Sequence, residues 1–170
     1  YNNGGRLMHH SGSPLKSQMR TLSNSKFLST FPDAVMPLLP DALQSMKSRQ
    51  RFSWLVQFHY GEPRLHYEMS KVRRGGDWEL GFHCEARDKR LNRFLLDGFR
   101  RNLFEIKDKL GEGFEAEMWD RGWTKIYEVV PAETLTSEFQ DRLAQRMAAI
   151  IICVHPIYVD LRGAVARVHR

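Results

Sequence analysis

Apolar and polar residues alternate along three consecutive segments of the chain, residues 51–60, 65–70 and 78–85. A period of two predicts strands that bury one face, and turns at 61–64 and 73–76 separate the segments. The pattern therefore predicts a three-stranded antiparallel meander with one apolar face. The core residues expected on that face are Phe52, Trp54, Val56, Phe58, Tyr60, Leu65, Tyr67, Met69, Trp78, Leu80, Phe82 and Cys84.

The rest of the chain predicts two helices and a hairpin. Apolar residues recur at helical spacing over 88–110 and again over 136–154, where His155-Pro156 is expected to end the second helix. Residues 114–119 and 123–130 alternate around the loop Asp120-Arg121-Gly122, which predicts a hairpin. The order β-β-β-α-β-β-α predicts an α+β fold, an antiparallel sheet of about five strands with two helices on one face.

The ends of the chain differ from its middle. Residues 1–26 are rich in Ser, Gly and Asn, which predicts a flexible leader or added, non-native sequence. Residues 27–50 predict a short helical arm, with a helical turn near 33–37 and a short helix near 40–48. We expect this arm to dock on the α+β domain at 51–160, and residues 161–170 to form a basic tail.

Composition narrows the class of protein. Hydrophobic residues make up 42% and charged residues 27% of the 170, which is typical of a globular domain. Only Cys84 and Cys153 are present, so the sequence predicts no disulfide scaffold and a reduced, cytoplasmic setting. No stretch approaches 18 apolar residues, so we expect no transmembrane helix and no membrane partner.

The formal net charge of +6 comes from the two ends of the chain. Residues 1–50 hold six Lys and Arg against two Asp, and residues 161–170 hold three Arg and no acid, whereas the middle is nearly balanced. A duplex-binding domain normally carries its positive charge on the folded body. We therefore expect contacts with nucleic acid only through the basic tails, and solvated ends are the simpler interpretation.

Several motifs between residues 78 and 155 carry a resemblance. Ala86-Arg87-Asp88-Lys89 opens a helix, Phe104-Glu105-Ile106-Lys107 and Leu110-Gly111 follow, and Phe114-Glu115-Ala116-Glu117-Met118-Trp119 begins the hairpin. These motifs resemble a bacterial family of uncharacterised domains that lie C-terminally in some restriction-endonuclease-like proteins. Lysine stands in this chain where the family prefers glutamate after the isoleucine. The resemblance implies an accessory module in a bacterial nucleic-acid or defence system, and it transfers no catalytic residue.

Turn lengths in the meander predict which histidines lie side by side. If both turns are tight, His59, His66 and His83 form a row across three strands, opposite the aromatic core. Imidazoles at this spacing can share a zinc or manganese ion, with Glu68 or Glu85 as a further ligand or general base. A register slip would break the row, and a solvated polar face is the expected interpretation. Clustered histidines also suit pH sensing.

The hairpin loop places Trp119 opposite Trp123 and Glu117 opposite Lys125. We expect helices to cover the face that carries the tryptophans; if that face meets solvent instead, it is a candidate binding patch. No catalytic residue is assigned. The candidate binding residues are Glu68, Glu79, Glu85, Trp119, Trp123, Lys125 and Tyr127.

Three functions follow from these patterns. We expect a non-enzymatic interaction or regulatory module of a bacterial-type cytoplasmic system, with a protein partner or a second copy of the chain and no cofactor. The partner would meet the open sheet face or the arm. The first alternative is a hydrolase or nuclease that uses zinc or manganese on the histidine-rich face. The second is a small-ligand binder with its pocket between sheet and helices.

Overall fold

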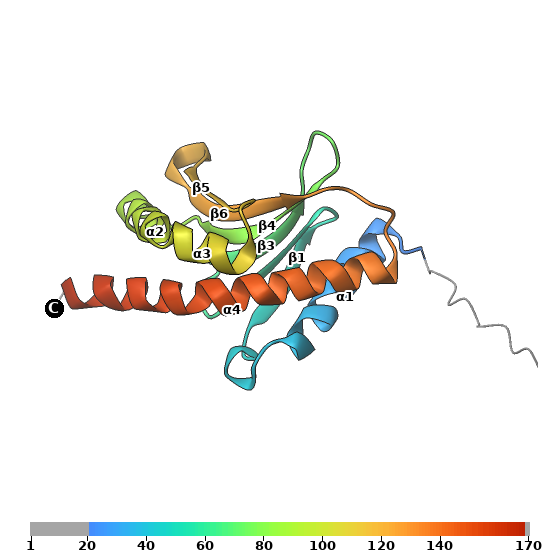
Figure 1. Cartoon of the computed structure of the whole chain (residues 1–170), viewed down its shortest axis with the longest axis horizontal. Helices are drawn as coiled ribbons and strands as arrows, with labels where there is room; N and C mark the ends of the chain where they lie inside the picture. Colours follow the sequence, from blue (N-terminus) through green and yellow to red (C-terminus); the bar gives the residue numbers. More distant parts are fainter. Residues whose placement is uncertain (1–20, 169–170) are drawn as a thin grey trace, which may run out of the picture.

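A six-stranded antiparallel sheet with the order β1-β2-β3-β4-β6-β5 organises the computed structural model, which describes residues 21–168 (Figure 1). The predicted α+β fold is confirmed, with one more strand than expected. The strands are β1 Lys47–Phe52, β2 Leu55–His59, β3 Leu65–Lys71, β4 Trp78–Cys84, β5 Glu115–Met118 and β6 Thr124–Val130. The helices are α1 Asn24–Val35, α2 Lys89–Arg101, α3 Leu103–Leu110 and α4 Ser137–Val168, with single 3-10 turns at Met36–Leu38, Asp41–Leu43 and Asp120–Gly122.

The additional strand arises because the chain reverses at Ser53-Trp54, within the segment predicted as one strand. Phe52 at the end of β1 pairs with Leu55 at the start of β2. Phe52 and Trp54 are exposed at 49% and 39%, and their rings stack with centroids 5.1 Å apart. The prediction that both belong to the core is therefore wrong. Their positions continue the alternation of β2, so periodicity alone does not reveal the turn.

The strand registers follow the turn lengths that the sequence predicts. His66 lies opposite His83 in the β3–β4 pair, and Glu117 lies opposite Lys125 in the β5–β6 pair. The hairpin loop closes with the Trp119 backbone N–H donating to the carbonyl oxygen of Trp123 at 2.9 Å. The meander and the hairpin are joined in one sheet because β6 pairs with β4.

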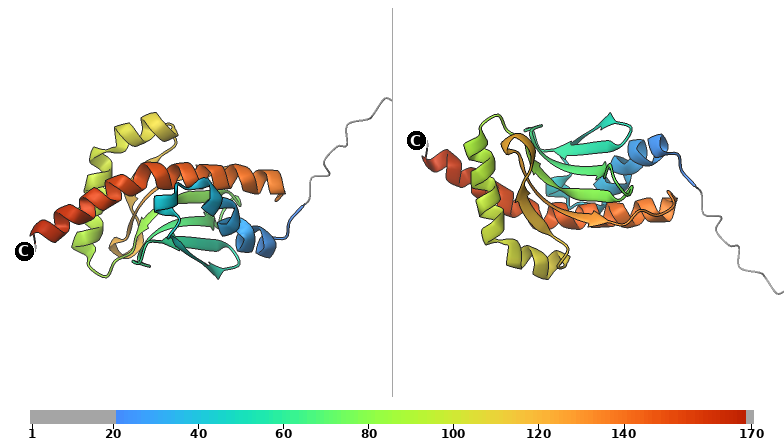
Figure 2. Two further views of the ribbon diagram at one scale, coloured as in Figure 1. Left: turned by 90° about the horizontal axis from the view of Figure 1, so that it is seen from below. Right: turned by 90° about the horizontal axis from the view of Figure 1, so that it is seen from above.

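The helices cover one face of the sheet and leave the other face open. In Figure 2, α4 crosses in front of the sheet in the left view and behind it in the right view. The covered face contributes fully buried side chains such as Phe58, Phe82 and Ile126, and α4 contributes Met147 and Ile151. The polar side chains that alternate with these strand residues therefore point to the open face.

One predicted helix is divided in the structure, and the other is longer than predicted. The helix expected over 88–110 is divided at Asn102 into α2 and α3, and the Asn102 side chain donates to the Gly98 carbonyl oxygen at 2.9 Å. The helix expected to end at His155 continues past Pro156 to Val168, so residues 161–168 of the predicted basic tail are helical. Tertiary contacts hold this extension, because Leu161 packs directly against Gly98.

The N-terminal arm docks on the domain, but with other boundaries than predicted. Helix α1 begins at Asn24, inside the predicted leader, with the Ser23 hydroxyl accepting from the Lys26 N–H at 3.2 Å. Phe27 and Phe31 are fully buried against the covered face. The predicted helix near 40–48 is wrong, because β1 already begins at Lys47. Residues 1–20 of the leader and 169–170 of the tail lie outside the described residues.

One helix of the described chain, α4, is long and apolar enough to cross a membrane by length and composition. Its most apolar window has a mean hydropathy of 1.5, and a core helix meets the same criterion. Met147, Ile150 and Ile151 of α4 are fully buried in the core. The absence of a membrane partner stays a prediction from the sequence.

Candidate functional site

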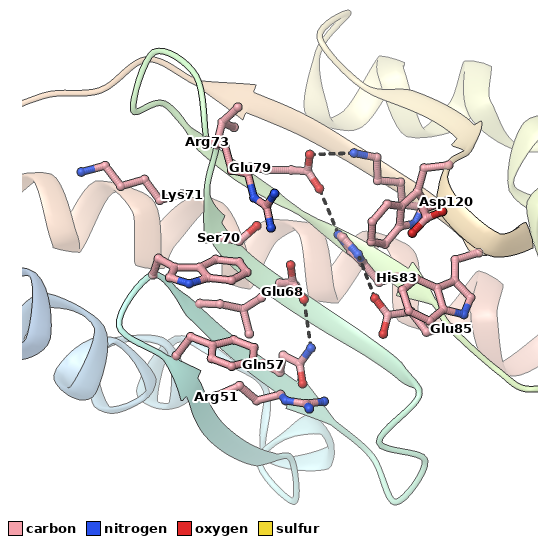
Figure 3. A pocket seen from close by; sticks show the side chains of 17 residues that line it. Arg51, Gln57, Glu68, Ser70, Lys71, Arg73, Glu79, His83, Glu85 and Asp120 are labelled. Carbon is pink, nitrogen blue, oxygen red and sulfur yellow. Dashed lines mark hydrogen bonds and ion pairs between the residues drawn. The ribbon is translucent and has the colours of Figure 1, made fainter.

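A cleft of about 550 Å³ lies over the open face of the sheet (Figure 3). Its floor comes from the strands β2, β3, β4 and β6, which present Gln57, Glu68, His83 and Lys125 among other residues. These positions alternate with core residues, so the pleat of each strand directs them away from the helices. The same alternation that builds the core thus builds a polar floor on the opposite side.

Aromatic side chains border the cleft on two sides. Phe52 and Trp54 lie at the β1–β2 turn, and Trp119 and Trp123 lie at the β5–β6 turn. The rings of the second pair lie 5.3 Å apart, and Trp119 is 37% exposed. The expectation that helices cover these tryptophans is wrong. Thr124 and the other alternate residues of β6 face the helices instead, which leaves positions 123, 125 and 127 on the open face.

His66 is fixed by hydrogen bonds at both ring nitrogens. Its Nδ1 lies 3.0 Å from the Pro63 carbonyl oxygen, which only accepts, so Nδ1 carries the proton. The Gln57 amide nitrogen lies 2.9 Å from His66 Nε2 and 3.0 Å from Glu68 Oε2. Arg49 Nε donates to the Gln57 side-chain oxygen at 3.1 Å, which sets the orientation of the amide. The Nε2 lone pair of His66 therefore points into the open-face site.

His83 lies among three carboxylates, and only 3% of its surface is exposed. Its Nε2 is 3.1 Å from Glu79 Oε1, and its Nδ1 is 3.9 Å from Glu85 Oε1. Neither approach has the geometry of a hydrogen bond, so both ring nitrogens lack a hydrogen-bonding partner within the described residues. Figure 3 shows the two carboxylates on either side of the ring.

These neighbours shift the pKa values in opposite directions. Burial opposes the charge of His83, but the nearby charge of Glu68 and the contacts with Glu79 and Glu85 raise its pKa to about 9. Burial alone would raise the pKa of Glu68, but the charge of His83, the His66 ring and the Gln57 hydrogen bond lower it to about 2. The metal-free site therefore holds a buried charge pair.

Lys125 forms a second group of contacts beside the histidines. Its Nζ lies 2.7 Å from Glu79 Oε2, 3.6 Å from Glu117 Oε1 and 3.8 Å from the centroid of the Tyr127 ring. The Tyr127 hydroxyl donates to Glu117 at 3.0 Å. The predicted residues Glu79, Lys125 and Tyr127 thus come together, and they satisfy one another's charges and hydrogen bonds.

Two of the three predicted histidines belong to one cluster of ligand-capable atoms. His66 and His83 stack with ring centroids 5.7 Å apart, and with Glu68 and Glu85 they place four ligand-capable atoms within 4.8 Å of one another. His59 lies outside this cluster. Burial and the charges of Arg49 and Lys47 lower its pKa, because β1 brings these cations beside the end of β2. The alternation of residues 51–60 does not reveal β1, so this environment could not be predicted from it.

The cleft residues that were not among the sequence-based candidates include Gln57, Arg51 and Arg73. The alternation already places Gln57 on the polar face, opposite Glu68, so its position could have been found. Arg51 belongs to the unpredicted strand, and Arg73 lies in a turn whose direction no pattern reports. Figure 3 shows the Arg73 side chain directed over the floor of the cleft.

No family model matches this chain, and no curated protein or solved structure matches it significantly. The resemblance to the bacterial family described above stays a prediction.

Proposed function

We propose that this protein is a non-enzymatic interaction module that binds a protein partner in the cleft of its open sheet face. The observation that carries the proposal is two aromatic groups on two sides of one cleft, the exposed Phe52 and Trp54 on one side and the exposed Trp119 with the partly buried Trp123 on the other. Tryptophan and arginine dominate the binding energy of protein interfaces, because they bury large areas in desolvated contacts. Exposed aromatic side chains of this size otherwise reduce solubility.

Charge indicates the chemistry of the partner. Arg51 and Arg73 line the cleft, and neither side chain takes part in an ion pair or hydrogen bond found within residues 21–168. The floor carboxylates Glu68 and Glu79, by contrast, already face His83 and Lys125. A partner segment with an aromatic or aliphatic side chain between the tryptophans and a carboxylate near the arginines fits this arrangement best.

The structure favours this proposal over a ligand pocket between sheet and helices. Trp78 and Phe99 on that side are 1% exposed and belong to the core, while the described cleft lies on the opposite face. A hydrolase needs a reactive centre in addition to a cleft. The only feature among the described residues that favours one is the histidine and glutamate cluster on the floor of the cleft.

Site-specific photo-crosslinking tests the proposal in the cell from which the protein comes. A photoreactive phenylalanine analogue replaces Trp54 or Trp119 in the full chain, and the matched control replaces Phe104 in α3, which is 87% exposed on the helical side. We expect the two cleft positions to label the same protein and the control position not to label it. Labelling that is equal at all three positions, or absent from both cleft positions, contradicts the proposal.

A further inference from the structure

The cluster on the floor of the cleft supports an inference that does not depend on the proposed partner. His66, Glu68, His83 and Glu85 come from neighbouring strands and the residue that follows β4, and their ligand-capable atoms lie within 4.8 Å of one another. We propose that these four residues form a zinc site. Zinc holds nitrogen and oxygen ligands at about 2.0–2.2 Å, so the ligand atoms of a tetrahedral site lie about 3.4 Å apart. Small side-chain rotations bring the four groups to that distance.

His66 is oriented as zinc-binding histidines are. Metal-bound imidazoles usually donate their other ring N–H to a carbonyl or carboxylate, which fixes the tautomer. The Pro63 carbonyl oxygen serves this purpose at 3.0 Å from His66 Nδ1. The Nε2 lone pair then faces Glu68 Oε2 at 3.2 Å, and two acceptors at this distance favour a cation between them. Gln57 would give up its bond to His66 and keep its bond to Glu68.

His83 supplies an independent reason to expect a ligand. Its side chain is buried, and its ring nitrogens make no well-formed hydrogen bond among the described residues; the carboxylates of Glu79, 3.1 Å from Nε2, and Glu85, 3.9 Å from Nδ1, lie beside them. A buried polar atom that lacks a well-formed hydrogen bond is costly in a folded protein, and native structures seldom leave one. A metal ion that accepts a lone pair from His83 removes this cost.

Charge also favours a divalent ion. Lys125 lies 2.7 Å from Glu79 and offsets its charge, which leaves two carboxylates, Glu68 and Glu85, around His83. A divalent cation bound by two neutral imidazoles and these two carboxylates makes the site neutral. The imidazoles disfavour calcium and magnesium, which prefer oxygen ligands, and zinc binds such a site more tightly than manganese.

The proposal is tested by titrating the chelator-treated full chain with zinc sulfate in a calorimeter, and with cobalt(II), whose visible absorption reports its ligands. We expect one zinc ion per chain, an increase in melting temperature with zinc, and a visible band with cobalt. Glu85→Gln is expected to weaken zinc binding at least about tenfold, since even the loss of a group that orients a ligand weakens metal binding by about 10–100-fold.

His59→Gln is the matched control, because His59 lies on the same face but outside the cluster. It is expected to bind zinc as the wild-type chain does. His83→Gln is the second ligand variant, and circular dichroism establishes whether each variant is folded. Glu85 is partly exposed, so Glu85→Gln keeps the test valid if His83→Gln does not fold.

The absence of zinc and cobalt binding to the wild-type chain overturns the proposal. Tighter binding of manganese than zinc, or equal losses in the His59 and Glu85 variants, also overturns it.

Discussion

The two faces of the sheet are built from the same strands but have opposite chemistry. In β4, Leu80 and Phe82 are buried under the helices, whereas Glu79 and His83 point to the open face and meet one another there. Both faces are largely buried, yet one is apolar and the other is held together by charge. Burial of a strand residue in this protein therefore does not indicate whether it belongs to the hydrophobic core.

Histidine shows the difference between the two faces most directly. His155 of α4 packs among the rings of Tyr60, Tyr67 and Tyr158 on the covered side, and burial lowers its pKa. His83 is more deeply buried, but the carboxylates of the open face raise its pKa to about 9. The same side chain is thus neutral on one side of the sheet and charged on the other at neutral pH.

The largest expected effect is on the covered face. Phe82→Ala removes a buried ring that packs against Tyr67, Phe99 and Tyr158. We expect the free energy of unfolding to fall by about 3–5 kcal/mol, because the substitution loses buried apolar area and leaves a cavity. Urea denaturation followed by circular dichroism measures the change. A loss below about 1 kcal/mol would show that Phe82 does not belong to a well-packed hydrophobic core.

The loss of a buried carboxylate on the open face should lower the free energy of unfolding less than Phe82→Ala does. Glu68→Gln keeps the shape of the side chain but removes the charge beside His83 and exchanges one of its two acceptor oxygens for an amide nitrogen that only donates. We expect the free energy of unfolding of the metal-free protein to fall by about 1–3 kcal/mol, the usual cost of leaving buried polar groups unpaired. Glu115→Gln on the exposed end of β5 is the control and should have no measurable effect. Equal effects would contradict a distinct role for the open-face cluster.

His83 and His155 on the two faces should also make stability depend on pH in opposite directions. The pKa of His83 is raised from 6.5 to about 9, so its stabilising charge is fully present below pH 6.5 and is lost as pH rises through about 9. The pKa of His155 is lowered, so the folded protein loses stability as pH falls below 6.5, where the unfolded chain takes up a proton. Denaturation of chelator-treated protein at several pH values measures both limbs.

His83→Gln is the variant that separates these two limbs. It should flatten the alkaline limb and leave the loss just below pH 6.5 unchanged, while His155→Gln should affect that loss alone. Below pH 4.5, His83→Gln also acts through Glu68, whose low pKa depends on the charge of His83. A carbon-bound imidazole proton signal of His83 that titrates near pH 6.5 in the NMR spectrum would contradict the open-face charge pair.

Local patterns in the sequence predict the fold class and most strand registers of this protein. Turn lengths and alternation were sufficient for the registers that bring His66 beside His83 and Lys125 beside Glu117, because each hairpin is local. They were sufficient for the α+β class as well, because the amphipathic helices follow from their own spacing. Local patterns are strong where partners are close in sequence.

The predictions from sequence fail where contacts between distant segments determine the structure. The chain reverses at Trp54 although the alternation continues through it, and β1 then brings Arg49 beside His59 and Gln57. Helix α4 passes Pro156 because Leu161 packs on α2, which outweighs the local preference of the residue before proline. The sequence of the hairpin could not show which of its faces the helices cover, so Trp119 was assigned to the wrong side.

Of the core and cleft substitutions, Trp119→Ala is expected to change stability least and binding most. Trp119 lies at the edge of the cleft and is 37% exposed, with its ring centroid 5.3 Å from that of Trp123 and edge-to-face with His83 at 5.9 Å. We expect Trp119→Ala to change the free energy of unfolding by less than about 1 kcal/mol and to abolish the crosslink from position 54. Denaturation and crosslinking of the same variant separate the two roles. If instead Trp119→Ala destabilises the protein as much as Phe82→Ala, the tryptophan holds the fold together, and the open face is a second core that lacks a docking surface.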